Sequence, residues 1–197
     1  MDRWLVKSRR WRAATFGACR VVALLSLLVF QHLAPSAAYA QATKGEWVLS
    51  GLALYSGIPD DSRSWHGGGV GIDAAYGLTE TWSVRMTAAS TAQRQAGEPD
   101  LGHVQHAALG LAGNFDVFSW IPWASVQLGW YRRGGALSET ALDPLGVALS
   151  AGFDYRPLRS VSAGVWLTSH RQIALRTSTM GTSAGLRVSW RWRPGLW

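Results

Sequence analysis

The chain has 197 residues, of which 19 are Lys or Arg and 12 are Asp or Glu, for a formal net charge of +7. Six of the basic residues lie before residue 21, and after residue 40 the balance falls to 13 basic against 11 acidic residues, which leaves no clustered basic face for a nucleic-acid partner. The single cysteine, Cys19, also lies in this first segment, so the rest of the chain offers no disulfide and no thiolate.

Residues 1–40 have the order of a secretory signal. Basic side chains come first, an apolar run over residues 21–30 follows, and Ala38 and Ala40 place small residues at positions −3 and −1 of a cleavage site. The apolar run has about half of the roughly 20 residues that a transmembrane helix needs. We therefore expect residues 1–40 to be a cleaved signal peptide and residues 41–197 to form one exported domain.

Two other kinds of signal fit this segment less well. A twin-arginine signal at Arg9-Arg10 would be followed by an apolar pair, whereas Trp11-Arg12 follows here. A lipoprotein signal would place Cys19 after the apolar run, whereas Cys19 precedes it. The cysteine is therefore expected to be removed with the signal.

After the signal, apolar side chains occupy every second position over stretches of about ten residues, which is the period of a β-strand. Over residues 69–78, for example, Val70, Ile72 and Tyr76 alternate with glycines, Asp73 and alanine. The pattern predicts eight strands, near residues 46–55, 69–78, 82–90, 104–115, 122–131, 144–155, 161–170 and 181–192. The predicted connections have 13, 3, 13, 6, 12, 5 and 10 residues.

This alternation of long and short connections is typical of outer-membrane barrels, whose long loops face outward and whose short turns face the periplasm. Closing an even number of strands on themselves also removes the sheet edge that lipid cannot solvate. The sequence therefore predicts an all-β fold, an eight-stranded antiparallel transmembrane up-and-down β-barrel. Its long loops would be residues 56–68, 91–103, 132–143 and 171–180.

Aromatic residues indicate which face of each strand meets the membrane. Most of them fall near predicted strand ends, as in the aromatic belts at the two bilayer interfaces, and only Trp166 sits at a strand centre. A soluble barrel would instead gather them along the strand centres. The predicted interface aromatics are Trp47, Tyr76, Trp82, Trp120, Trp123, Trp130, Tyr155, Trp190 and Trp192.

The opposite face is then expected to line the lumen. Eight strands leave little or no open bore, so a packed polar plug is predicted. Counting back from the short turn near 79–81 places Asp73 roughly opposite Arg85, and we expect a buried ion pair between them. The predicted lumen residues are Asp73, Arg85, His106, Asn114, Gln127, Asp154, His170, Arg187 and Arg191.

Three segments resemble small outer-membrane β-barrel proteins of the OmpA/OmpX/OmpW-like class: AYGLTETWSVR (75–85), FDVFSWIPWASVQLGW (115–130) and ALSAGFDYRPLRSVSAGVWL (148–167). The last strand, SAGLRVSW (183–190), resembles the barrel-assembly signal of such proteins at Gly185, Val188 and Trp190. Because five residues follow Trp192, either Trp190, Trp192 or Trp197 could supply the terminal aromatic. The resemblance implies a monomer in the cell outer membrane, with membrane lipid, lipopolysaccharide and the barrel-assembly machinery as partners.

Several motifs resemble parts of enzymes. Gly181-Thr182-Ser183-Ala184-Gly185 matches a nucleophile elbow and His66-Gly67-Gly68-Gly69 an oxyanion loop, but no helix, acid and histidine follow the serine, as a hydrolase requires. Ser169 and His170 are adjacent and so point to opposite faces of a strand. His103 and His106 are also expected on opposite faces, which argues against a metal pair. We expect no enzyme activity, cofactor or metal.

The expected function is therefore a structural or surface-interaction role for an outer-membrane barrel with a packed polar lumen. One alternative is a narrow low-flux channel for a small or apolar solute. A less favoured alternative is an enzyme that modifies lipid A. The barrel alone does not decide among these, because one scaffold serves unrelated activities.

Overall fold

The computed structural model describes residues 44–59, 64–95, 100–115, 119–137, 145–173 and 180–194. The signal peptide predicted for residues 1–40 and the alternative terminal aromatic Trp197 lie outside the described residues. Over the described part of the chain, no helix is long and apolar enough to span a membrane.

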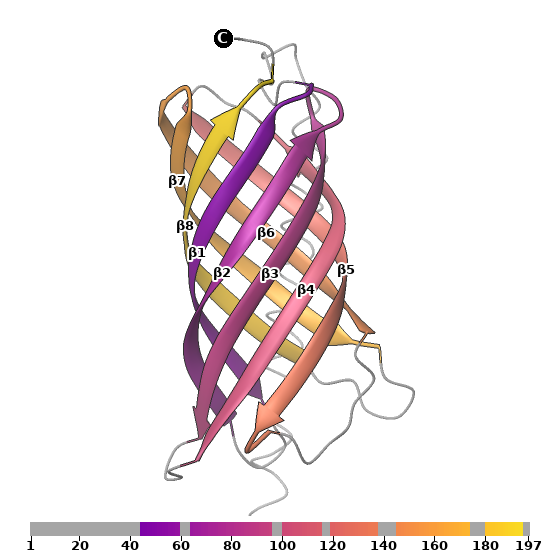
Figure 1. The fold of residues 1–197 in the computed structure, drawn as a ribbon, viewed down its shortest axis with the longest axis vertical. Coiled ribbons are helices and arrows are strands. Elements are labelled where there is room, and N and C mark those ends of the chain that lie inside the picture. The colour runs from indigo at the N-terminus through magenta and orange to yellow at the C-terminus, as the bar shows by residue number, and fades with distance from the viewer. Residues whose placement is uncertain are drawn as a thin grey trace, which may run out of the picture. The chain divides into compact units, whose positions relative to one another are not determined.

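Eight strands make up the described domain. They are β1 (Trp47–Pro59), β2 (Ser64–Gly77), β3 (Trp82–Gln95), β4 (Leu101–Asn114), β5 (Trp120–Gly135), β6 (Leu145–Leu158), β7 (Val161–Gln172) and β8 (Met180–Trp192). Each strand pairs antiparallel with the next, and β8 pairs antiparallel with β1 to close the barrel (Figure 1). The predicted eight-stranded up-and-down barrel is therefore confirmed.

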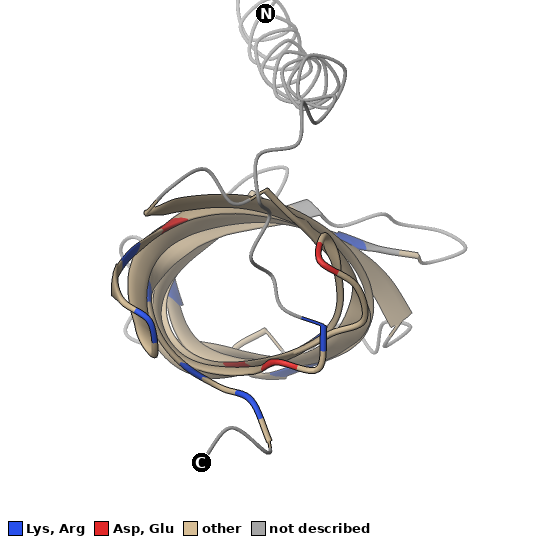
Figure 2. Ribbon diagram, turned by 90° about the horizontal axis from the view of Figure 1, so that it is seen from above, with Lys and Arg blue, Asp and Glu red and all other residues tan. Residues whose placement is uncertain are grey.

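The barrel has two ends, which we name by the chain segments found there. The terminal end holds the start of β1 and the end of β8, and lies at the top of Figure 1. The loop end holds the connections β1–β2, β3–β4, β5–β6 and β7–β8. Viewed along the barrel, the strands form a ring with basic and acidic positions spread around it (Figure 2).

The strands are longer at the loop end than the sequence predicted. β1 continues to Pro59 and β2 begins at Ser64, so only residues 60–63 connect them, where a 13-residue loop was predicted. The predicted alternation of long and short connections is correspondingly weaker. Main-chain pairing continues through residues whose outward side chains are small or polar, so the strand persists where its apolar alternation has ended.

Two local features shape the connections. At the terminal end, the Thr79 hydroxyl accepts hydrogen bonds from the backbone N–H groups of Thr81 and Trp82 at 3.2 and 2.9 Å, which fixes the β2–β3 turn. At the loop end, Gly135 has a φ of 66°, in the left-handed region that glycine adopts without strain. After it the chain turns so that Leu137 is buried.

Side chains alternate between the outside and the inside of the barrel along every strand. The outer surface carries a band of exposed apolar side chains: Leu49, Val70, Ile72, Met86, Leu109, Leu111, Val126, Leu128, Leu149, Phe153, Val165, Leu167, Leu186 and Val188. The interior is mostly polar, but it also holds an apolar cluster of Leu52, Leu54, Ala89, Trp123 and Trp166. The sequence did not predict this cluster, because β1 carries leucines on both of its faces.

Candidate functional site in the barrel interior

The nine side chains predicted for the lumen all turn inward. Six are buried, namely Asp73, Arg85, Gln127, Asp154, Arg187 and Arg191. His106, Asn114 and His170 are half-buried and line interior cavities. Together with their neighbours they form three layers along the barrel.

The middle layer is a network of charges around one tryptophan. The Arg85 Nε lies 2.5 Å from Asp73 Oδ2, and the Arg187 Nη2 lies 3.2 Å from Asp154 Oδ2. Both guanidinium groups lie over the ring of Trp123, with Cζ at 3.7 Å from its centroid for Arg85 and 4.9 Å for Arg187. A cation over an aromatic face is attracted by the ring quadrupole. The layer therefore holds four buried charges in two ion pairs across the barrel interior.

Asp73 and Arg85 are not directly opposite in the ladder. Asp73 pairs with Thr87 and Arg85 with Ala75, so the ion pair is diagonal between neighbouring strands. The Thr87 hydroxyl also donates to Asp73 Oδ2 at 2.9 Å, and the Gln127 side-chain amide donates to Thr87 Oγ1 at 3.1 Å. These neutral groups supply the additional hydrogen bonds that a buried charge requires.

The layer at the terminal end is smaller. Arg191 Nη1 lies 3.5 Å from Glu46 Oε2, and the Asn114 amide donates to Ser83 Oγ at 3.0 Å. A cavity of about 30 Å³ lies among these groups and Arg85. The ion pair between Glu46 and Arg191 joins the first and last strands, where the barrel closes.

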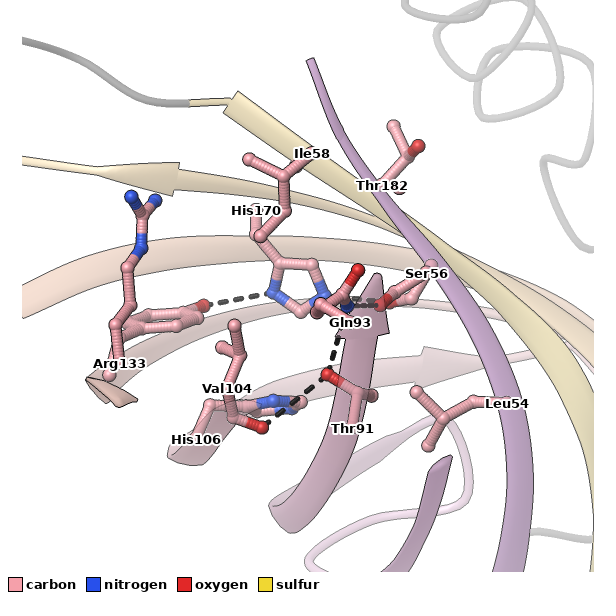
Figure 3. Close-up of a pocket in the computed structure, with 14 residues that line it drawn as sticks. Leu54, Ser56, Ile58, Thr91, Gln93, Val104, His106, Arg133, His170 and Thr182 are labelled. Atoms are coloured by element: carbon pink, nitrogen blue, oxygen red, sulfur yellow. Dashed lines mark hydrogen bonds between the residues drawn. The ribbon is translucent and has the colours of Figure 1, made fainter. Parts of the chain in front are cut away.

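The layer nearest the loop end is built on histidine and tyrosine (Figure 3). His170 Nδ1 lies 3.0 Å from the Tyr131 hydroxyl, and His170 Nε2 lies 2.7 Å from Ser183 Oγ. The His106 ring is 5.0 Å from that of His170 and stacks on Tyr131 at 5.6 Å. These residues line a cavity of about 50 Å³ with Gln93, whose amide donates to Thr91 Oγ1 at 3.0 Å.

Two members of this layer were missed by the sequence analysis. The serine next to His170 is Ser183, which the neighbouring strand β8 provides, and not the adjacent Ser169. Tyr131 lies four residues from Gln127, so the strand period already placed both on one face. In the sequence, Ser183 stands out only in the hydrolase-like motif and at the start of the segment that resembles the assembly signal.

Trp123 is a correction to the predicted interface aromatics. It is 4% exposed and lies under Arg85 inside the barrel, because it shares the inward face of β5 with Gln127. Its position near a strand end suggested the membrane interface, whereas its parity along the strand decides its direction. The odd or even position of Trp123 along its strand can be read from the sequence, and it predicts the direction of the side chain better than its nearness to a strand end does.

The other predicted interface aromatics face outward. Trp47, Trp82, Trp120, Tyr155 and Trp190 are exposed near the terminal end, and Trp130 is exposed toward the loop end. Tyr76 and Trp192 are half-buried, because each packs on Trp47, with ring centroids at 4.8 and 6.5 Å. The three residues of the predicted assembly signal, Gly185, Val188 and Trp190, lie on β8, with Val188 and Trp190 exposed.

Trp65 is a second correction. The sequence placed it in a long loop, but it lies on β2, is 7% exposed and packs with Ile58 and Leu137 inside the loop end of the barrel. The adjacent glycines Gly67 and Gly69 lie on the same strand, and a side chain at either would collide with the backbone of β3. The oxyanion-like motif is therefore a strand segment in which glycine permits close packing.

Metal binding and nucleophilic catalysis each require a particular set of side chains. The described residues contain no group of three His, Cys, Asp or Glu that could hold a metal ion. His103 is exposed and His106 points inward, on opposite faces as predicted. A histidine beside a serine can act as its general base. Here the second nitrogen of His170 faces a tyrosine hydroxyl where catalytic triads present a carboxylate.

Comparisons with known proteins address the fold. No protein-family model matches the chain, and no curated protein matches it. Among solved structures, Neisserial surface protein A is 16% identical with a TM-score of 0.55, over 75% of this chain and 96% of its own. The outer membrane protein OprG from Pseudomonas aeruginosa is 14% identical with a TM-score of 0.51, over 78% and 99%.

The Ail protein of Yersinia pestis, an attachment invasion locus protein, is 14% identical with a TM-score of 0.54, over 76% of this chain and 100% of its own. Identities this low show similarity of fold and not of activity. The described strands account for the matched region, since they span residues 47–192. The chain therefore has the eight-stranded barrel fold of small outer-membrane proteins.

Proposed function

We propose that this chain is a protein of the cell outer membrane that crosses the bilayer as a closed barrel and acts at the cell surface, without conducting solutes. The outward apolar band and the aromatics that flank it support insertion into lipid. Strands of 12–16 residues exceed the roughly 9–11 that a spanning β-strand needs, so their ends extend into water at the surface. Insertion would require the barrel-assembly machinery, and the barrel would act as a monomer in contact with lipid and lipopolysaccharide.

The observation that carries this proposal is the filled middle of the barrel. Asp73, Arg85, Trp123, Asp154 and Arg187 pack against one another there, and all five are buried. Moving any of these charges out of its ion pair would leave the partner buried and unpaired, at a cost of about 3–5 kcal/mol. Spontaneous opening of a bore through this layer is therefore unfavourable.

A narrow passage is the second candidate, because three small cavities follow one another inside the barrel. Their volumes are about 50, 20 and 30 Å³ from the loop end to the terminal end. His106 and His170 line both the first and the second cavity, and Arg85 lines both the second and the third. Each volume suits one or a few water molecules and not a larger solute.

Lipid-modifying catalysis has less support. Ser183 is 2% exposed, and the adjoining cavity of about 50 Å³ is far below the roughly 300–1,000 Å³ of small-molecule sites. An acyl chain on the outside of the barrel could not reach this hydroxyl. We therefore assign the contact between Ser183 and His170 to packing of the interior.

Three measurements test the proposal. The expressed chain should fractionate with outer membranes, and the refolded protein should show β-type circular dichroism in detergent. Planar bilayers that contain it should show no steps of conductance. Recovery as a monodisperse protein without detergent would end the membrane assignment, whereas a steady small conductance would favour the narrow passage.

A further inference from the structure

We propose that the outer face of β2–β5, near the loop end, binds one acyl chain of lipid A and places a lipid A phosphate against Arg132 and His103. This inference rests on the proposed outer-membrane location. The inference goes beyond that location, because it names one lipid and one side of the barrel. The four strands lie side by side at the front of Figure 1.

The acyl-chain site is a trough of about 430 Å³ that is open to the outside. Ladder partners place Ile72, Ala88, Ala107 and Trp130 in one outward row across the four strands. The two alanines form a low floor, while Ile72 and Trp130 form higher walls on either side. In the next outward row toward the terminal end, large side chains occupy the positions on β3, β4 and β5, namely Met86, Leu109 and Leu128, and only the β2 position, Ala74, is small.

The next outward row toward the loop end changes from apolar to polar. It runs from Val70 through Ser90 and Gln105 to Arg132, again as direct ladder partners. Ser90 and Gln105 belong to the lining of the trough, and Arg132 is exposed. Successive outward residues on a strand are about 7 Å apart. Arg132 therefore lies one row closer to the loop end than Trp130.

Basic side chains on the outer face gather on the loop-end side of the trough. Of the outward Arg and His side chains in the loop-end halves of the described strands, four lie on β2–β5: His66, Arg94, His103 and Arg132. The fifth, Arg171, lies on β7. His103 is one row beyond Gln105, which is the ladder partner of Arg132. Asp100, immediately before β4, is also exposed, so at least one carboxylate among the described residues lies at this end.

An apolar trough that ends at an arginine and an imidazole donor fits a lipid with acyl chains and an anionic head group. The loop end faces the outer leaflet in the proposed orientation, and the lipid of that leaflet with this chemistry is lipid A, which carries phosphates on an acylated sugar. Arginine recognises a phosphate through two parallel hydrogen bonds, and it does so more strongly near lipid than in bulk water. Lipid A is therefore the occupant, in preference to a phospholipid with a single phosphate.

The test uses the full chain, refolded in detergent and checked by circular dichroism. Binding of purified bisphosphorylated lipid A is compared with that of dephosphorylated lipid A and of phosphatidylglycerol by native mass spectrometry. Arg132→Gln should weaken lipid A binding several-fold, since one cation at a lipid surface contributes about 1 kcal/mol, or about fivefold. His103→Ala should also weaken it, because it removes an imidazole N–H that can donate to a phosphate oxygen. Ala107→Phe should weaken binding of both forms of lipid A by filling the trough.

Arg171→Gln is the matched control, because it removes an exposed outward arginine at the same end but on β7. It should leave lipid A binding unchanged. Equal weakening by Arg171→Gln, or unchanged binding in Ala107→Phe, would overturn the inference, as would preference for phosphatidylglycerol. Failure of the unaltered protein to fold in detergent would instead overturn the proposed function, so the two outcomes are distinguishable.

Discussion

At the scale of single residues, the Asp73–Arg85 pair has the largest expected energetic effect. Asp73 is buried and receives hydrogen bonds from both Arg85 and Thr87. Asp73→Ala leaves the Arg85 charge uncompensated and close to Arg187, so we expect a loss of about 3–5 kcal/mol in the free energy of unfolding. The midpoint of urea unfolding of the refolded barrel measures this loss.

Two further variants separate a buried pair from a general effect of charge. Adding Arg85→Ala to Asp73→Ala should recover part of the loss, because the orphaned cation is then absent. Asp100→Ala removes an exposed carboxylate outside the strands and should change stability by about 0–1 kcal/mol. If the double variant instead lost the sum of the stabilities lost by Asp73→Ala and Arg85→Ala separately, Asp73 and Arg85 would not act as a pair.

The His170 side chain gives a second prediction at this scale. His170→Leu leaves the Tyr131 and Ser183 hydroxyls without the hydrogen bonds that His170 makes with them. Losing a partner costs about 1–3 kcal/mol for each buried polar group, so the urea midpoint should fall clearly. Ser169→Ala, on the opposite face of the same strand, should have little effect, and similar losses in both variants would argue against this contact.

At the scale of strands, the number, direction and facing of the strands could be predicted from the sequence, whereas their ends could not. A membrane requires apolar side chains only along the segment inside lipid. Beyond it, Gly67 and His66 still pair with Gln93 and Arg94 of β3, although no apolar alternation marks them. The lengths of the connections were therefore overestimated.

The interior side chains that could be predicted are those whose placement depends on nearby sequence. Asp73 and Arg85 follow from strand parity and the position of one short turn, which are local properties of the sequence. The contact of His170 with Ser183 depends on the register between β7 and β8, where His170 pairs with Gly181. Registers across a longer connection depend on the assembled barrel, and a single sequence does not contain that information in readable form.

Strand β8 provides a prediction about assembly. Trp190 lies in both the proposed assembly signal and the aromatic belt at the terminal end, whereas the equally outward Trp82 lies only in the belt. Trp190→Ala should therefore lower the amount of barrel inserted in cells more than Trp82→Ala does. Quantified outer-membrane fractions measure this, and equal losses would remove the reason to assign a signal to β8.

At the scale of the whole molecule, the barrel combines a lipid-facing exterior with an interior that is closed by one layer. Trp123 connects that layer, since both Arg85 and Arg187 lie over its ring. It also packs with Leu52 and Trp166 in the apolar cluster of the interior. Trp123 therefore supports the two arginines that line the cavity toward the terminal end.

Trp123→Ala should consequently connect the interior cavities and give a small conductance in planar bilayers, where the unaltered barrel gives none. The indole removed is large compared with the cavities of about 20 and 30 Å³ that Arg85 lines, and the two guanidinium groups, which repel each other, then lack the ring over which both lie. Trp130→Ala is the matched control, because Trp130 lies on the same strand but faces outward, and it should remain silent. A folded Trp123→Ala barrel that does not conduct would mean that the charged residues close the lumen without the tryptophan.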